Sequence, residues 1–304
     1  MPNSLTLPPP LKPGDLLRVV APCGALKELA AFNKGVEVWR SRGYQVEFGK
    51  YWDSCYGYLA GTDQQRRQSL AEAWQEEECK GILCARGGYG STRLLEDWQW
   101  LVNSSTSPKW LVGFSDVTGL LWSLAKEGIS SLHGPVLTTL GQEPKWSIER
   151  LFAAVEGRPL EPLSGDGWVG GQAMGILLPA NLAVATNLLG THLQPPLSGT
   201  ILAFEDVGEA PYRLDRMLTQ WRMMGAFKGI KAIALGRFSD CEGTKNSWTV
   251  EEMLRDRLTD LNIPIVANLP FGHDGVNAAL QVGQLVELNG NEGILRSIKR
   301  KTIM

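Results

Sequence analysis

The sequence predicts an α/β protein built around a parallel sheet that helices cover on both faces. Short apolar runs alternate with helix-like segments along the first half of the chain, and those runs are apolar almost throughout. Near-continuous apolar strands are typical of parallel sheets buried on both sides. The chain has 304 residues, which at about 150 residues per domain favours two domains. We expect a ligand site at the carboxyl ends of the strands, where such sheets bind ligands.

In the first half, four predicted strands are each followed by a predicted helix. The strands are 15–22, 44–49, 80–85 and 110–114. The helices are 26–42, a segment from Thr62 or Asp63 to about 78, a segment containing Leu94 and Leu95, and a segment through Leu120, Leu121 and Leu124. Gly43 is suited to end the first of these helices, and Thr62 or Asp63 to cap the second.

The stretch 157–170 is dense in glycine and proline, and we place a domain boundary there, near residue 165. The predicted domains are 1–165 and 166–304. In the second, the predicted strands are 199–206, 230–238 and 263–270, the helices are 211–224 and 249–261, and a terminal hairpin turns at 289–291.

Composition excludes several classes of protein. Thirty basic and 32 acidic residues give a net charge of −2, so we expect no nucleic-acid partner. Five scattered cysteines without a C-x-x-C pair argue against a disulfide framework and a zinc site. No apolar stretch approaches about 18 residues, and the N-terminus lacks the pattern of a signal peptide. We therefore expect a soluble protein of the reducing cytoplasm, with no membrane partner.

Ser115 is the candidate nucleophile. It follows an apolar strand and precedes a helix in VGFSDV, so its hydroxyl is expected above the edge of the sheet. The next backbone N–H would lie at a helix N-terminus, where it can stabilise an oxyanion. The segment resembles a nucleophile elbow, but Val117 stands where G-x-S-x-G has its second glycine. A helix N-cap is the alternative role for this serine.

A serine nucleophile needs a base, and the chain has three histidines, His133, His192 and His273. His273 follows an apolar strand and lies between Gly272 and Gly275, which leaves its ring accessible as a general base. The alternative is an ordinary loop histidine. His192 lies in a loop rich in turn residues, and a structural role is expected for His133, which ends a short strand.

A catalytic histidine needs a carboxylate that fixes its tautomer. Glu205 ends the apolar strand ILAFE, whereas Asp206 and Glu209 follow within a turn and are competing candidates. An acidic cluster flanking a helix is the alternative. Ser115, Glu205 and His273 each lie at the carboxyl end of a predicted strand, so two facing sheet edges would form a site between the domains.

The run Arg86-Gly87-Gly88-Tyr89-Gly90 connects a predicted strand with a helix. Its consecutive glycines can turn backbone N–H groups inward, either as a phosphate cradle or as a second oxyanion donor. The spacing of known nucleotide-binding loops is absent. Arg86 is a candidate partner for a substrate carboxylate, because its planar fork suits that group. A tight turn with a surface arginine is the alternative.

These residues resemble the LD-carboxypeptidases, a family of serine peptidases typified by murein tetrapeptide carboxypeptidase. The resemblance covers nearly the whole chain and depends on the order and spacing of several modest motifs. They are RVVAPCGA (18–25), GILCARGGYGSTRLL (81–95), VGFSDVTGLL (112–121), LHGP (132–135), ILAFEDVGEAPYRLDRML (201–218) and LPFGHDGVNAALQVG (269–283).

The resemblance implies a triad of Ser115, Glu205 and His273, with an oxyanion hole from the backbone N–H groups of Gly88 and Asp116. It implies a flavodoxin-like N-terminal domain, a smaller α/β C-terminal domain and a homodimer, with no metal or other cofactor. The implied reaction is hydrolysis of the amide between an L-centre, such as that of meso-diaminopimelate, and a C-terminal D-alanine in murein tetrapeptides, during cell-wall recycling in the cytoplasm.

Two positions depart from the family's pattern. Cys23 stands where serine or threonine is common, and GILLPANL at 175–182 replaces a Gly-Gly-Asn-Leu element, with Pro179 and Ala180 stiffening the backbone. Other functions remain open. One is a self-immunity hydrolase that cleaves an aminoacyl-nucleotide toxin, with some of the eleven tryptophans as a platform for the base. Another is a non-catalytic muropeptide sensor, and the third is a nucleotide-binding protein.

Overall fold

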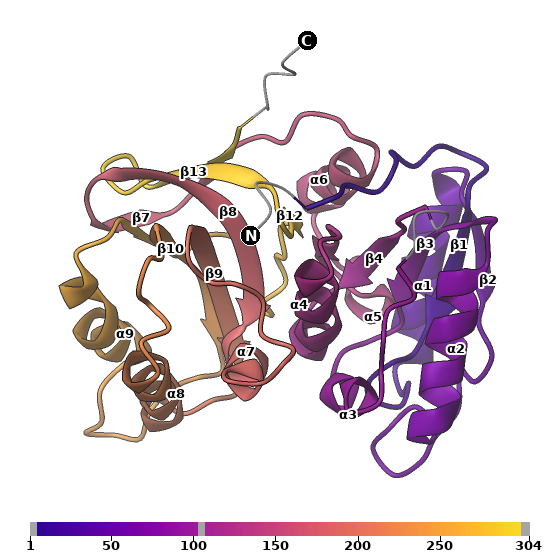
Figure 1. The fold of residues 1–304 in the computed structure, drawn as a ribbon, viewed down its shortest axis with the longest axis horizontal. Helices are drawn as coiled ribbons and strands as arrows, with labels where there is room; N and C mark the ends of the chain where they lie inside the picture. The colour runs from indigo at the N-terminus through magenta and orange to yellow at the C-terminus, as the bar shows by residue number, and fades with distance from the viewer. Residues whose placement is uncertain (1–4, 103–106, 299–304) are drawn as a thin grey trace.

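The computed structural model describes residues 5–102 and 107–298, and within them the strands form a six-stranded and an eight-stranded sheet. Figure 1 shows the two sheets side by side, with helix α4 (Thr118–Lys126) between them. The α/β class and the two-domain organisation are as the sequence predicts.

The first sheet consists mainly of strands from the first half of the chain. Its strands are β1 (Leu16–Val20), β2 (Gln45–Phe48), β3 (Cys79–Cys84), β4 (Trp110–Gly113), β5 (Leu132–His133) and β12 (Leu280–Gln281). Their spatial order is β12-β5-β4-β3-β1-β2, and the first five strands of the chain run parallel. The order 2-1-3-4-5 is that of flavodoxin-like folds. The predicted flavodoxin-like sheet is thus confirmed.

Helices cover both faces of this sheet because its strands are apolar on both sides. They are α1 (Leu29–Ser41), α2 (Asp63–Gln75), α3 (Ser91–Leu95), α4, α5 (Leu137–Leu140) and α6 (Lys145–Val155). Val20 and Ile82 pack in one core cluster with α2 and α4, whereas Val19 and Leu83 pack in another with α1, α5 and α6. Thr62 caps α2 with a capping box, as its position predicts.

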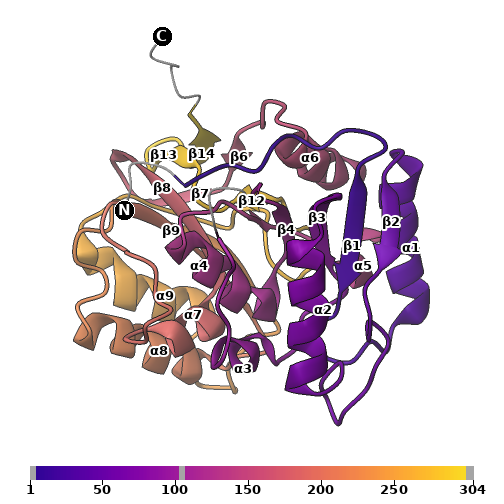
Figure 2. The same ribbon diagram turned by 45° about the vertical axis from the view of Figure 1, so that its right-hand side comes forward.

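The second sheet is mixed. Its strands are β6 (Leu163–Ser164), β7 (Asp166–Val169), β8 (Gln172–Asn181), β9 (Thr200–Val207), β10 (Ala232–Ser239), β11 (Ile265–Ala267), β13 (Leu285–Asn289) and β14 (Ile294–Ser297). Strands β8 to β11 run parallel, and the outer strands are antiparallel. Helices α7 (Leu182–Leu188), α8 (Pro211–Met223) and α9 (Val250–Leu258) gather on one side of it (Figure 2).

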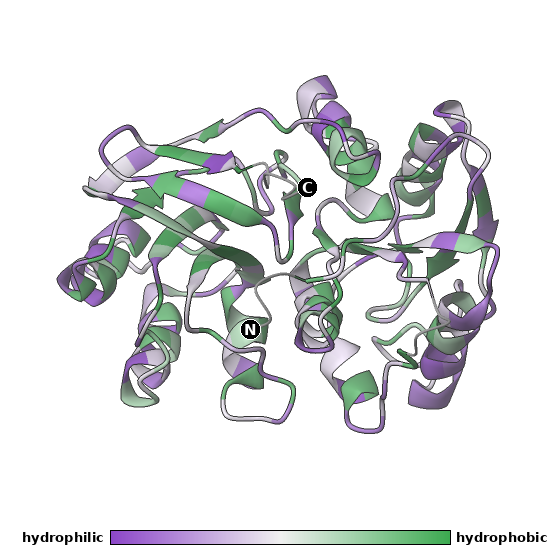
Figure 3. Cartoon of the chain, turned by 45° about the horizontal axis from the view of Figure 1, so that its top comes forward, coloured by the Kyte–Doolittle hydropathy of each residue, from purple (hydrophilic) through white to green (hydrophobic). Residues whose placement is uncertain are grey.

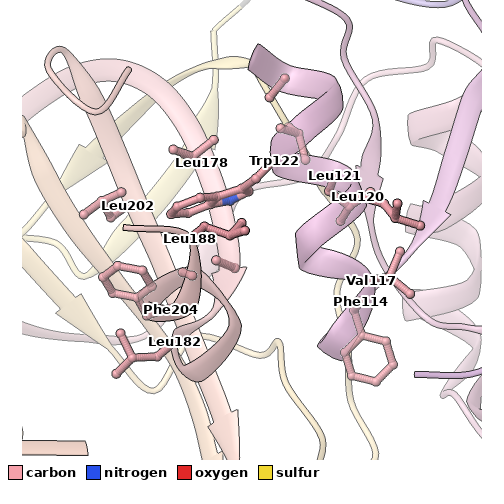
Figure 4. Close-up of a cluster of buried hydrophobic side chains, with 14 of the residues drawn as sticks. Phe114, Val117, Leu120, Leu121, Trp122, Leu178, Leu182, Leu188, Leu202 and Phe204 are labelled. Atoms are coloured by element: carbon pink, nitrogen blue, oxygen red, sulfur yellow. The ribbon is translucent and has the colours of Figure 1, made fainter. Parts of the chain in front are cut away.

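One apolar core joins the two sheets through α4. Trp122 of α4 is completely buried and lies among Leu178, Leu188 and Leu202 of the second half (Figure 4). Its indole N–H donates a hydrogen bond of 2.9 Å to the Pro179 carbonyl. Apolar residues concentrate on the strands, and polar residues on the outer surfaces of the helices (Figure 3).

Several elements differ from their predicted extent. The glycine- and proline-rich stretch 157–170 contains β6 and β7, and the predicted strand 263–270 narrows to β11. The predicted helix 249–261 is α9 followed by a 3₁₀ turn at Thr259–Leu261. Strand β6 of the second sheet precedes residue 165, and β12 returns to the first sheet, so the chain divides between the sheets at more than one point. The domain boundary itself stays a prediction.

Candidate active site

Ser115 begins the 3₁₀ turn Ser115–Val117, between β4 and α4. Its φ angle of 63° lies in the left-handed region, which costs a residue other than glycine about 1–3 kcal/mol. Such strain is typical of a nucleophile elbow, in which a sharp turn presents the serine above the sheet. The turn therefore has the elbow's geometry even though Val117 replaces the second glycine of the motif.

Glycines on the neighbouring strand–helix connections make room for this turn. A Cβ atom at Gly87 would lie 2.9 Å from Ser115 Cβ and 3.0 Å from its Oγ, and one at Gly113 would lie 2.8 Å from a methyl group of Val117. The loop after β3 consequently packs directly against the serine. The N–H groups of Gly88 and Asp116 make no hydrogen bond to another described residue, so both are free to bind a substrate oxygen.

The Asp116 side chain links the serine turn to the start of α3. It is buried and accepts a 2.8 Å hydrogen bond from the Ser91 N–H, while the Ser91 hydroxyl donates to the Asp116 carbonyl at 2.5 Å. Burial raises the pKa of Asp116, although interactions with Cys23 and Ser91 oppose the rise. Cys23 therefore lies beside the carboxyl group that fixes the turn, and its own thiol pKa is raised by burial.

Glu205 and His273, both in the second half of the chain, are in direct contact. His273 Nδ1 lies 2.6 Å from Glu205 Oε2, and the Glu205 side chain is completely buried whereas that of His273 is 17% exposed. Burial lowers the pKa of His273, but the hydrogen bond and charge of Glu205 outweigh it, and the net pKa is raised. Because Nδ1 faces the carboxylate, Nε2 is the ring nitrogen left for another partner.

The serine turn lies beside this pair. The ring centroids of Phe114 and His273 are 4.6 Å apart, and Phe114 directly precedes Ser115. No hydrogen bond joins Ser115 and His273 in the described part of the chain, and such bonds often tighten only when substrate binds. The contacts thus join Glu205 to His273 directly, and Ser115 follows the residue whose ring packs against His273.

Asp206 and Glu209, the competing carboxylates, have other partners. Successive side chains of a strand point to opposite faces, so Asp206 turns away from His273. It accepts 2.9 Å hydrogen bonds from Asn181 Nδ2 and the Ala183 N–H, and burial together with the charge of Glu205 raises the pKa of Asp206 to about 6. Glu209 lies 3.5 Å from Arg213. The alternation along β9 thus selects Glu205.

Arg86 is already engaged within the protein. Its Nη1 donates to the Ala25 carbonyl at 2.8 Å and lies 3.4 Å from Glu28 Oε2. A hollow of about 390 Å³ opens beside Arg86 and the β3–α3 loop. The hollow is lined by Gly24, Lys27, Tyr58, Arg86, Gly88 and Tyr89.

Lys27, Tyr58 and Tyr89 are residues that the sequence analysis did not single out. Lys27 has no ion-pair partner among residues 5–102 and 107–298, and the rings of Tyr58 and Tyr89 lie 5.9 Å apart at the surface. Only their place in the loops at the carboxyl ends of β1, β2 and β3 could have indicated them.

Two further findings concern the described residues. They contain no group of three or more His, Cys, Asp or Glu side chains arranged to hold a metal ion. No helix formed by these residues has the length and apolar character needed to cross a membrane.

His192 is exposed and lines a different hollow, with Trp98 and Lys126.

Two family models match this chain. Residues 17–134 match the LD-carboxypeptidase N-terminal domain, and residues 174–288 match the LD-carboxypeptidase C-terminal domain. The chain belongs to the LD-carboxypeptidase family. It is accordingly a member of a family of peptidases, as its motifs predict.

Relatives match over nearly the full chain. A putative carboxypeptidase of Synechocystis sp. is 59% identical over 97% of this chain and 98% of its own. The murein tetrapeptide carboxypeptidase of Pseudomonas aeruginosa is 32% identical, covering 90% and 92%.

Solved structures show the same fold. The muramoyltetrapeptide carboxypeptidase of Oxalobacter formigenes is 30% identical, with a TM-score of 0.82 over 92% of this chain and 97% of its own. A microcin C7 self-immunity protein bound to aspartyl sulfamoyl adenosine is 21% identical, with a TM-score of 0.83 over 97% and 99%. That last likeness concerns the fold alone.

Proposed function

We propose that this protein is a serine LD-carboxypeptidase that removes the C-terminal D-alanine from murein tetrapeptides, as a cytoplasmic step of cell-wall recycling. The observation that carries the proposal is the Glu205–His273 pair beside the strained Ser115 turn, in a chain of this family. Relatives named for murein peptides support the choice of substrate.

In the proposed reaction His273 acts first as a base. Its Nε2 accepts the Ser115 proton while Oγ attacks the carbonyl carbon before D-alanine. The tetrahedral intermediate then collapses: the C–N bond breaks, His273 returns the proton to the leaving amine, and an acyl ester on Ser115 remains. Water, deprotonated by the same imidazole, hydrolyses the ester and restores the serine. Glu205 holds the ring in the required tautomer and stabilises its charged form.

The Gly88 and Asp116 N–H groups are the proposed oxyanion hole. Neither makes a hydrogen bond to another described residue, so they can bind the developing oxyanion without a competing acceptor. A donor of this kind contributes about 3–4 kcal/mol to the transition state where one has been removed by mutation.

The terminal carboxylate of the substrate needs a cation, and the hollow beside the β3–α3 loop, whose Gly87 packs against Ser115, offers two. Arg86 was the expected partner, and its contacts with Ala25 and Glu28 hold it at the wall of the hollow. Lys27 lines the same hollow and lacks an ion-pair partner in the described part of the chain. We place the carboxylate between these two side chains.

Mass spectrometry of a murein tetrapeptide incubated with the wild-type protein and with Ser115→Ala tests the proposal. Wild type alone should release one D-alanine. The same peptide ending in L-alanine, or amidated at its C-terminus, should be cleaved far more slowly, because the site selects a D-residue with a free carboxylate.

Release of D-alanine by both proteins would show that Ser115 is not the nucleophile. Release by neither, with both folded by circular dichroism, would contradict the substrate. An aminoacyl sulfamoyl adenosine should then be tried in the same assay, since it represents the ligand class of the self-immunity neighbour.

A further inference from the structure

A second histidine lies against the catalytic carboxylate. His133 ends β5, and both its side chain and that of Glu205 are completely buried. His133 Nε2 is 4.0 Å from Glu205 Oε1, the carboxylate oxygen that His273 does not use. Glu205 therefore lies between two imidazole rings.

The polar atoms on both sides of this gap lack other partners. Within the described residues, neither the ring nitrogens of His133 nor Glu205 Oε1 has a hydrogen-bond partner. An unpaired buried polar group costs about 1–3 kcal/mol, so three such atoms at one place need an explanation. The gap of 4.0 Å is too short for a bridging water, since two hydrogen bonds in series span about 4.5 Å or more.

Aromatic side chains flank the ring of His133. Its ring makes edge contacts with Phe114, at 5.9 Å between centroids, and with Phe271, at 6.4 Å. Its backbone is fixed by pairing with Gly113 of β4 on one side and Leu280 of β12 on the other. The ring thus packs between apolar side chains, and the polar atom that it approaches is Glu205 Oε1.

We propose that His133 is a positioning residue of the triad, whose Nε2–H donates to Glu205 Oε1 in the working enzyme and so fixes the carboxylate with Oε2 toward His273. The inference deepens the proposed function and rests on it. A movement of about 1 Å by either side chain brings the two atoms to hydrogen-bond distance. The contact matters most when His273 carries the serine proton and Glu205 must remain charged and correctly oriented.

The charge state of His133 suits this role. Burial, with the neighbouring His273, lowers the pKa of His133 to about 3, so its ring is neutral in the range where the enzyme would work. A neutral ring can donate one N–H without adding a positive charge beside His273. A charged ring would compete with His273 for the carboxylate.

Three variants separate positioning from packing. His133→Phe keeps the ring and the apolar cage but removes the donor, and His133→Gln keeps an N–H at a similar reach. His192→Phe changes an exposed histidine elsewhere and serves as the matched control. The kcat and KM for the tetrapeptide and the rate of labelling by an activated phosphonate are measured together with the thermal midpoint.

We expect His133→Phe to lower kcat and the labelling rate by about 10- to 100-fold, the range known for groups that orient a ligating histidine. KM should stay within about twofold and the thermal midpoint should not fall, because the change removes an unpaired buried polar group. His133→Gln should recover most of the loss. Wild-type kcat in His133→Phe, or a His133→Gln as slow as His133→Phe, would overturn the inference.

A nitrogen-15 NMR titration of the wild-type histidines tests it without any variant. His133 should remain a neutral Nε2–H tautomer between about pH 5 and 9, and a Nδ1–H tautomer or an ordinary titration would overturn it. If the proposed function itself is wrong, the result is different: the wild-type protein would neither cleave the tetrapeptide nor react with the phosphonate at Ser115.

Discussion

At the residue scale, Glu205 raises the pKa of His273. Burial alone would lower the pKa of His273, and the hydrogen bond and charge of Glu205, with smaller contributions from the charges of Asp206 and Asp274, reverse that effect. Since the imidazole must be neutral to accept the Ser115 proton, the acid limb of kcat/KM reports its pKa. That limb therefore measures the interaction within the pair.

We expect the acid limb of the wild-type kcat/KM profile to have its midpoint above about 6.5, the ordinary pKa of histidine. Activity should fall as the pH drops through this midpoint, because His273 becomes protonated. In Glu205→Gln the burial remains without the charge, so the midpoint should move below about 6.5, and kcat should fall by roughly a thousand- to ten-thousand-fold.

The profile is measured with the tetrapeptide between about pH 5 and 9, and the His273 ring is titrated by NMR where turnover is too slow. An unchanged midpoint in Glu205→Gln would show that Glu205 does not set the pKa of His273. Circular dichroism of the variant checks that its fold is retained.

The sequence identifies the residue types of the site better than their individual partners. Ser115 and His273 follow from strand ends and neighbouring glycines, and the end of an apolar strand favours Glu205, but Asp206 and Glu209 stay competing candidates along the sequence. Only the side-chain alternation of β9, which directs Glu205 to His273 and Asp206 to Asn181, separates them. Arg86 was expected to be free for substrate, and its contact with Ala25 is a tertiary one that no local pattern indicates.

At the scale of elements, the site depends on how closely the β3–α3 loop approaches the serine turn. Gly87 contacts Ser115 so tightly that a methyl group would lie within 3.0 Å of Oγ. Its φ angle is not among the positive ones, so space rather than backbone conformation demands glycine here.

Gly87→Ala should lower kcat by about 100-fold, because a shift of the nucleophile by about 1 Å costs that much. Gly225→Ala is the control: it lies at a φ of 64° with no atom within 4 Å of the added methyl group. This control should lose about 1 kcal/mol of stability and keep its kcat. Kinetics and thermal unfolding of both variants measure the contrast, and a Gly87→Ala with wild-type kcat would refute the tight approach.

Sequence patterns predicted the elements with continuous apolar runs and missed those without them. Strands β1, β3, β4, β9 and β10 lie where expected, since burial on both faces leaves an unbroken apolar signature, and the edge strand β2 lies where expected although only Val46 of it is buried. Strand β8 contains Pro179, which normally argues against a strand. It is tolerated because β13 pairs with β8 only as far as Ile176, so no neighbour on that side needs the missing N–H.

At the scale of the whole molecule, the proposed active site depends on one core that the two halves share. Ser115 follows β4 of the first sheet, whereas Glu205 lies in β9 of the second sheet and His273 follows β11 of that sheet. Trp122 of α4 packs into the second half (Figure 4), and β12 of the second half pairs with β5 of the first. Relative displacement of the sheets would separate the nucleophile from its base.

The most direct test of this account is active-site labelling with an activated phosphonate, followed by intact-protein mass spectrometry and peptide mapping. The wild-type protein should carry one adduct, on Ser115, and His273→Ala should slow its formation by about 100-fold or more. This result would show that a residue of the second half activates a nucleophile of the first half. An adduct on another residue, or labelling of His273→Ala at the wild-type rate, would contradict the account.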